Sequence, residues 1–193
     1  MRHLFTIAAA TLLVSAVPSS AQERLTLDIR TAVAIPTEKF ANADLDPGIG
    51  FGATLAFRLQ PHLHVYGGWD WLHFSADQSF AGSKMDFEET GYTLGLRFEH
   101  PVRESSRFAY RIEAGGTYKH IEVENEDGDI VADSDHGAGF EAGAGLLTPI
   151  RGGWRLSTML RYRSLNRDLT VANTTSSGSL RYGALEVGIT RRF

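Results

Sequence analysis

The stretch that decides the fold is residues 185–193, in which apolar side chains alternate with small or polar ones: Leu185-Glu186-Val187-Gly188-Ile189-Thr190-Arg191-Arg192-Phe193. A period of two places Leu185, Val187 and Ile189 on one face, which predicts a β-strand with one apolar side. The run ends on an aromatic residue, Phe193. We expect this strand to complete its sheet, and a sheet completed by its last strand favours closure.

The same alternation recurs along the chain. Apolar residues occupy every second position in the runs 25–35, 49–59, 64–71, 89–98, 108–119, 139–146 and 154–163. Short connections (60–62, 100–106, 148–153) alternate with longer polar ones (37–48, 75–86, 120–138, 166–178). This pattern predicts an all-β, antiparallel, up-and-down sheet of about eight strands, with the short turns at one end and the long loops at the other.

Composition limits the classes of protein that remain. The 193 residues suit one domain, and no internal run approaches the roughly 18 apolar residues of a membrane-spanning helix. The formal net charge of −4 argues against nucleic acid as a partner. Cysteine is absent, so neither disulfides nor a lipid anchor on cysteine is expected. Strands of alternating polarity can still cross a membrane as a barrel.

The first 21 residues have the layout of a secretory signal. Arg2 and His3 precede an apolar stretch that runs to Val17, and the small residues Ser19 and Ala21 suit a peptidase that cleaves before Gln22. We therefore predict a signal peptide at residues 1–21 and a barrel domain at residues 22–193. An uncleaved anchor helix would need a longer apolar segment.

Volume indicates which face of the sheet points outward. The apolar face carries many aromatic rings, which would overfill the interior of an eight-stranded barrel. The opposite face is rich in glycine and carries charges of both signs, and these can pair in a polar interior. We therefore predict a charge network in the lumen that includes Glu89 together with Arg30, Arg97, Arg111, Glu113, Glu141, Arg161, Arg163 and Glu186.

With these features the chain resembles the OmpA/OmpX-type eight-stranded outer-membrane β-barrels of Gram-negative bacteria. The resemblance is carried by the signal layout, the alternation over residues 23–193, the Gly-rich segments 91–97 and 139–145, and the terminal Phe193. It implies short periplasmic turns, long extracellular loops, an outer-membrane location and contact with lipid and lipopolysaccharide. It further implies that the barrel-assembly machinery recognises Leu185, Val187, Ile189 and Phe193, although Arg191 departs from the usual apolar residue.

We expect a non-enzymatic barrel without a cofactor, with a plugged polar lumen and a role in envelope integrity or in surface interaction through its loops. A narrow or gated channel is the main alternative, because paired charges could rearrange; Glu113, Glu141 and Arg161 would be tested first. A soluble periplasmic barrel that binds an apolar ligand is a further alternative.

A lipid A-modifying enzyme is the third alternative. The deacylases among small barrels carry His and Ser two residues apart on the penultimate strand, as nucleophilic catalysis requires. Here Arg161 and Arg163 occupy those positions. His136, next to Ser134 and Asp135, is a weak substitute for such a pair.

An acidic segment separates two of the predicted strands. Asp127-Gly128 is a hairpin turn signal, and flanking apolar residues could continue the ladder above the membrane. The segment can be a solvated loop. Alternatively, it can bind a divalent cation or a basic surface ligand, although the spacing of its acidic residues fits no EF-hand. Its acidic residues are Glu122, Glu124, Glu126, Asp127, Asp129, Asp133 and Asp135.

Overall fold

The computed structural model describes residues 24–171 and 174–193 and, within them, nine antiparallel strands. These are β1 (Leu25–Pro36), β2 (Gly48–Gln60), β3 (Leu63–Ser79), β4 (Gly82–Pro101), β5 (Ala109–Glu124), β6 (Ile130–Asp133), β7 (Gly137–Pro149), β8 (Trp154–Val171) and β9 (Thr174–Arg192). No helix in the described part of the chain is long and apolar enough to cross a membrane. The predicted signal peptide lies outside the described residues and stays a prediction.

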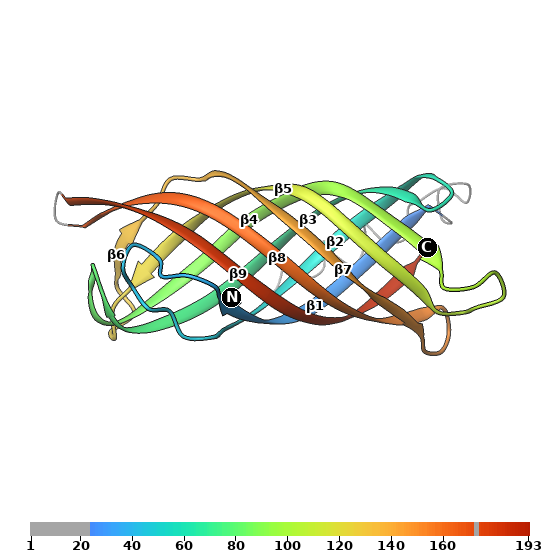
Figure 1. The fold of residues 1–193 in the computed structure, drawn as a ribbon, viewed down its shortest axis with the longest axis horizontal. Coiled ribbons are helices and arrows are strands. Elements are labelled where there is room, and N and C mark those ends of the chain that lie inside the picture. The colour runs from blue at the N-terminus through green and yellow to red at the C-terminus, as the bar shows by residue number, and fades with distance from the viewer. Residues whose placement is uncertain (1–23, 172–173) are drawn as a thin grey trace, which may run out of the picture.

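Eight of the strands close into a ring (Figure 1). Hydrogen bonds link them in the order β4-β3-β2-β1-β9-β8-β7-β5, and β4 pairs with β5 to complete the circle. The first and last strands meet from Thr26 opposite Arg192 to Pro36 opposite Tyr182. Only β6 stands outside the ring among the described strands, paired with the end of β5. The prediction of a closed up-and-down barrel is confirmed.

Three short connections lie at the end of the barrel where β1 begins and β9 ends (Figure 1), the end that the resemblance predicts to be periplasmic. They span residues 61–62, 102–108 and 150–153. In the last of these, Gly152 and Gly153 have φ angles of 64° and 81°. Glycine reaches this left-handed region without a steric penalty, and the chain can therefore reverse between β7 and β8.

At the opposite end, which is expected to be extracellular, two hairpins are longer than the sequence predicts. Residues 75–86 and 166–178 were expected as loops, but β3 and β4 leave only residues 80–81 between them, and β8 and β9 leave only 172–173. The cause is that inward-facing apolar positions such as Ala76 and Leu169 extend the ladder further than the polar composition of these segments suggests. The segment between β1 and β2 is a genuine loop.

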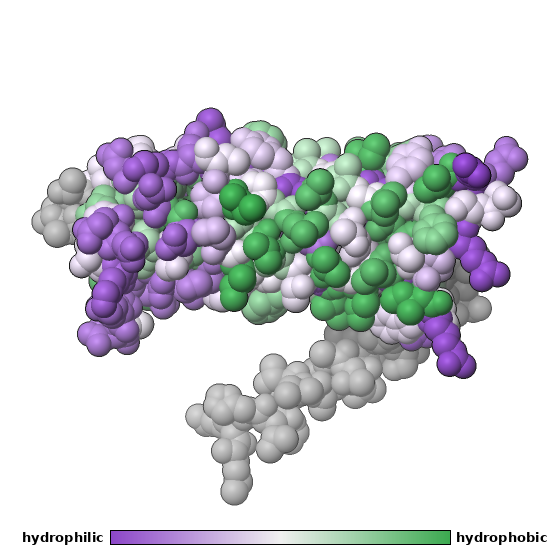
Figure 2. Space-filling model, turned by 60° about the horizontal axis from the view of Figure 1, so that its bottom comes forward, coloured by the Kyte–Doolittle hydropathy of each residue, from purple (hydrophilic) through white to green (hydrophobic). Residues whose placement is uncertain are grey.

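The outer surface carries an apolar band, as predicted from the crowding of aromatic rings. Figure 2 shows hydrophobic residues around the middle of the barrel and toward the periplasmic turns, and hydrophilic residues over the extracellular end. Leu94 and Leu160 are each 67% exposed, which would be costly in water and is favourable in lipid. Exposed Phe57 and Phe108 lie near the short turns, and exposed Tyr92 and Tyr118 lie toward the other interface.

The interior has two halves of different chemistry. Toward the periplasm it is filled by ionised side chains, which are described below. Toward the outside it holds an apolar core that includes Leu72, Phe74, Phe87, Ile121, Val123, Leu165, Leu169 and Leu180. Phe40, Ala43 and Leu45 from the β1–β2 loop fold inward and are 0–7% exposed, with the Phe40 ring edge-on to Phe87 at 6.0 Å. The prediction of a polar lumen is therefore wrong for the extracellular half of the barrel, which has an apolar core.

Candidate functional site

The charged half of the interior draws its members from seven of the eight ring strands. Alternation turns every second residue of each strand inward, so charges placed at those positions converge on the barrel axis. The inward-facing acidic residues are Asp28, Asp70, Glu89, Glu99, Glu113, Glu141 and Glu186, and each is at most 5% exposed. The cations are Arg30, Arg97, Arg111, Lys119, Arg161 and Arg163.

Arg161, on β8, is the central connector of this network. Its Nη2 atom lies 2.6 Å from Glu113, its Nη1 atom 2.7 Å from Glu141 and its Nε atom 2.9 Å from Glu186. One guanidinium thus joins carboxylates from β5, β7 and β9. Charge-assisted bonds of this length are the strong kind, and they fix the geometry of the groups they join.

Arg163 forms the upper layer, next to the apolar core. It donates to Glu141 at 2.6 Å, to Asp70 at 3.1 Å and to the hydroxyl of Tyr182 at 2.6 Å. Lys119, which is fully buried, donates to Glu89 at 2.7 Å and also to Asp70. Each of these buried cations therefore meets more than one acidic group.

Arg97 and Arg111 form the lower layer, toward the periplasm. Arg97 lies 2.6 Å from both Asp28 and Glu113, and Arg111 lies 2.7 Å from Glu99 and 3.1 Å from Asp28. Charges buried in this way are tolerated because they are paired, and they become costly when one partner is removed.

The structure brings together all nine of the predicted lumen residues, Glu89 included. Sequence reasoning left four members out of that set: Asp28, Asp70, Glu99 and Lys119. Each of them stands on the inward face of its strand, so the same alternation that selected the others could have found them. Arg30 lies at the edge of the network, 3.2 Å from Asp70 and 3.4 Å from Glu186.

Three of the four residues predicted as an assembly signal lie on the lipid-facing side of β9. Leu185, Val187 and Ile189 are 48%, 43% and 41% exposed on the outer wall. Phe193 follows the strand, and the Arg191 guanidinium lies 5.2 Å from the ring centres of both Phe193 and Trp154. The arginine that departs from the family pattern thus lies close to two aromatic rings, although it remains exposed.

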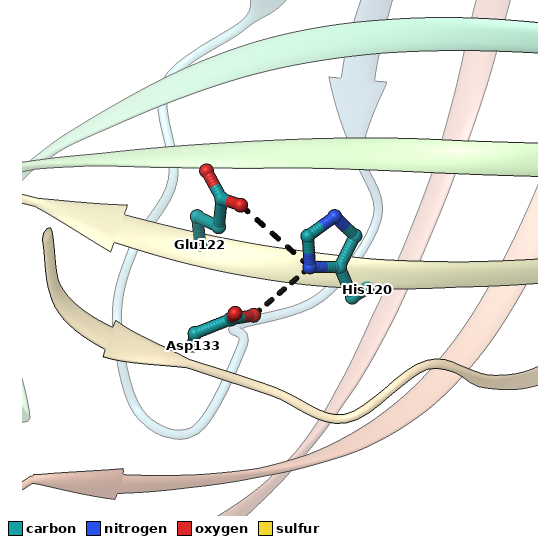
Figure 3. A group of neighbouring side chains, drawn as sticks. All are labelled: His120, Glu122 and Asp133. Atoms are coloured by element: carbon teal, nitrogen blue, oxygen red, sulfur yellow. Dashed lines mark hydrogen bonds and ion pairs between the residues drawn. The ribbon is translucent and has the colours of Figure 1, made fainter.

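The acidic segment is divided by the fold. Glu122 on β5 and Asp133 on β6 come together at His120, whose Nδ1 atom lies 2.9 Å from Asp133 and 3.7 Å from Glu122 (Figure 3). Ligand atoms of these three residues all lie within 4.8 Å of one another, close enough to hold one metal ion. His120 was not among the residues predicted for this site, because it precedes the acidic run in sequence.

A second acidic group adjoins the first. Glu88 stands opposite Glu122 across the β4–β5 ladder, and Asp86 stands opposite Glu124. Like charges directly opposite one another on a sheet are destabilising. Burial, together with Glu88, Glu122 and Asp86, raises the pKa of the Glu124 carboxyl above its ordinary value.

The other predicted acids are not brought to these groups. Glu126 pairs with Lys84 at 2.7 Å. Asp127 and Asp129 belong to the turn, where their backbone N–H groups donate to the Asn125 side chain. Asp135 lies in the connection between β6 and β7.

The residues considered as a nucleophile and its base, Ser134 and His136, make contacts with other groups. The Ser134 hydroxyl accepts a hydrogen bond from the Ile121 N–H at 2.8 Å. The His136 ring stacks on His120 at 4.2 Å between ring centres. In the described part of the chain, no hydrogen bond joins Ser134 to His136, and Arg161 and Arg163 are both held by carboxylates.

A closed ring of strands with an apolar outer band and a charged interior defines the class of transmembrane β-barrels. The profile of the family described as "Outer membrane protein beta-barrel domain" matches residues 6–193, and the chain belongs to this family. It is accordingly a bacterial outer-membrane protein, whose apolar band lies in lipid. The comparison with curated proteins finds no match.

Solved structures support the same fold. Neisserial surface protein A (NspA) is 15% identical, with a TM-score of 0.59 over 88% of this chain and 96% of that one. OprG from Pseudomonas aeruginosa is 10% identical, with a TM-score of 0.60 over 89% and 97%. The E. coli outer membrane protein W is 15% identical, with a TM-score of 0.57 over 89% and 98%. At these identities the likeness concerns the fold alone.

Proposed function

We propose that this protein is a non-conducting, non-enzymatic barrel that holds an extracellular β-sheet extension at the cell surface, where the extension takes part in surface interactions. The observation that carries the proposal is the double closure of the interior. Arg161 and its three carboxylates block the charged half, and the inward-folded β1–β2 loop with Phe40 blocks the apolar half. An eight-stranded barrel has no room for a water path once its interior is filled by side chains.

Conductance in a planar lipid bilayer tests the closure. We expect the wild-type protein to give no steady current above that of the bare bilayer. A variant with Arg161→Ala and Phe40→Ala, which removes one element from each block, should conduct if the barrel still forms. Arg103→Ala, in an exposed periplasmic turn, is the matched control. Steady ion-selective current through the wild type would instead favour the channel alternative.

The non-enzymatic part of the proposal rests on the arrangement of Arg161, Arg163, Ser134 and His136. Neither pair provides a nucleophile held by a base, which acyl transfer and hydrolysis require. Mass spectrometry of lipid A after incubation with the protein is the test. We expect an unchanged acylation pattern, and loss of an acyl chain would overturn this part.

A second candidate function is the binding of a divalent cation on the extension. The like-charged pairs Glu88–Glu122 and Asp86–Glu124 favour it, since a cation would relieve their repulsion, and His120 supplies a nitrogen ligand beside Glu122. One imidazole with two carboxylates suits Zn²⁺ or Mn²⁺ better than Ca²⁺. The cluster faces outward above the apolar band.

Calorimetric titration with Zn²⁺ tests this second function. We expect His120→Ala and Asp133→Asn each to weaken binding by about tenfold or more, since each removes one of three ligands. Asp129→Asn is the matched control, because Asp129 is acidic and lies in the same hairpin but outside the cluster. Equal weakening by all three variants would indicate a diffuse charge effect and exclude a defined site.

Two further inferences concern export and assembly. We infer that residues 1–21 are removed during export, and that Leu185, Val187, Ile189 and Phe193 are read by the barrel-assembly machinery. The lipid-facing exposure of the first three supports the second inference. Intact mass of the protein taken from outer membranes tests the first, and the amount of folded barrel in a Phe193→Ala strain tests the second.

A further inference from the structure

The periplasmic mouth of the barrel contains a cavity of about 300 Å³. This is the lower end of the size range of small-molecule pockets, about 300–1,000 Å³. Its charged lining is dominated by arginine: Arg58 from β2, Arg107 from the β4–β5 turn, Arg155 from β8 and Arg192 from β9. Glu99 is the one carboxylate among its lining residues. The cavity is therefore strongly electropositive.

Glu99 carries one negative charge, which it shares with Arg111 of the lumen network, so it cannot neutralise all four cavity arginines. It accepts hydrogen bonds from Arg111 at 2.7 Å and from Arg155 at 3.2 Å, and Arg192 lies 3.7 Å away. Among the described residues, neither Arg58 nor Arg107 has a carboxylate within salt-bridge distance. The mouth thus has positive charge in excess, in contrast to the lumen above it, where the cations meet acids.

Two buried polar groups on the cavity wall have no hydrogen-bond partner. His64 is 2% exposed, and both of its ring nitrogens lack a partner among the described residues. The same holds for the Nη2 atom of Arg155. Buried polar groups are nearly always satisfied, so these two groups on the wall of one cavity point to a ligand that bonds to them. Arg155 Nη2 needs an acceptor, and the His64 ring offers one N–H donor and one acceptor nitrogen.

Two further histidines present nitrogen atoms at the same mouth. His62 Nδ1 lies 2.9 Å from the Glu99 carbonyl, and His100 Nδ1 lies 2.7 Å from the Pro101 carbonyl. Because a carbonyl can only accept, Nδ1 carries the proton in both rings, and Nε2 is left for another partner. The two ring centres are 4.6 Å apart.

We propose that this cavity is a binding site for a phosphate group. Arginine forks match the oxygens of phosphate, and the excess of positive charge suits a group that carries up to two negative charges. The mouth lies beside Phe108 and Trp154, whose aromatic rings mark the level of the lipid headgroups. The phosphate can therefore come from a phospholipid of the periplasmic leaflet or from a soluble phosphate ester.

The test uses protein extracted from outer membranes into dodecyl maltoside, a detergent without phosphate, in a buffer without phosphate. Inorganic phosphate and a short-chain phosphatidylglycerol are titrated separately, and binding is followed by calorimetry. Tighter binding of phosphatidylglycerol assigns the site to lipid, and binding of inorganic phosphate that is equal or tighter assigns it to soluble esters. Either result supports the proposal, and absence of binding by both probes overturns it.

The variant Arg58→Gln/Arg107→Gln removes two cavity arginines that the fold does not use in ion pairs. We expect it to bind at least about tenfold more weakly, as loss of charge-assisted bonds implies. The matched control Arg103→Gln/Arg151→Gln removes the same charge from the same end, outside the cavity lining. Equal weakening in both would overturn a defined site. Arg192→Gln, whose side chain is 42% exposed, provides a second variant if the first does not fold.

Discussion

The two halves of the barrel interior are built from the same eight strands and are filled by opposite means. The extracellular half is packed with apolar side chains and a loop that folds in from outside, like the core of a soluble protein. The periplasmic half is filled from the wall itself by paired charges. Apolar packing is non-directional, whereas the ion pairs require defined geometry. The interior of one barrel can therefore be closed by apolar packing in one half and by ion pairs in the other.

The largest effect is expected from breaking the charged half at Arg163. Arg163→Met leaves Asp70, Glu89 and Glu141 with an uncompensated buried charge, and such losses cost about 4 kcal/mol of the free energy of unfolding. Urea unfolding in lipid vesicles, followed by tryptophan fluorescence, measures it. Arg103→Met in the exposed turn is the control, and a loss below about 1 kcal/mol would contradict the ion-pair account.

A somewhat smaller loss is expected from breaking the apolar half at Phe40. Phe40→Ala leaves a cavity beside Phe87 and releases the β1–β2 loop, so the free energy of unfolding should fall by about 3 kcal/mol. The lipid-facing Leu94→Ala is the control, because lipid can fill the space and no cavity forms. If both variants lose the same amount, the loop does not contribute to the core.

An exposed ion pair outside the barrel interior shows how much burial contributes to the strength of the lumen pairs. Lys84 and Glu126 lie 2.7 Å apart, but each side chain is 65% exposed. Lys84→Ala should change the free energy of unfolding by less than about 0.5 kcal/mol, because water screens the pair. The same urea experiment measures it. A loss as large as that of Arg163→Met would show that burial is not what distinguishes the lumen pairs.

The smallest effect is a pH dependence at the extracellular end. Because the folded state raises the pKa of Glu124, ionised Glu124 disfavours folding, and stability is gained as pH falls through that raised pKa. Carbon NMR titration of the carboxyl should show a pKa above the ordinary value, and Glu88→Gln should lower it. Gln78→Glu, on the neighbouring hairpin, is a control that should leave it in place.

Much of this fold could be predicted from alternation alone. The polarity contrast in residues 185–193 and 91–97 indicates which side faces lipid, and the inward charges follow from it. The apolar core was missed because the contrast disappears where Leu72 and Phe74 continue the inward face of β3. Where a strand carries apolar residues on both faces, the alternation no longer indicates which face points into the barrel.

The partners within the network could not be predicted in the same way. The contact of Arg163 with Asp70 joins residues 93 positions apart, on strands that are not neighbours in the ring. It depends on the stagger of the whole barrel, which no local pattern encodes. His120 joins Asp133 because β6 returns beside β5, a pairing that depends on the turn at Gly128.

The seam between β1 and β9 has a consequence for the order of folding. Thr190 donates a hydrogen bond to Asp28 across 162 positions of sequence, and Asp28 is also a partner of Arg97 and Arg111. The lower layer of the network is therefore incomplete until the last strand docks onto the first. Until then the sheet has two unpaired edges that lipid cannot satisfy. Closure and completion of the charged layer should accordingly be one late, cooperative step, and a chain that lacks β9 should not form a closed barrel.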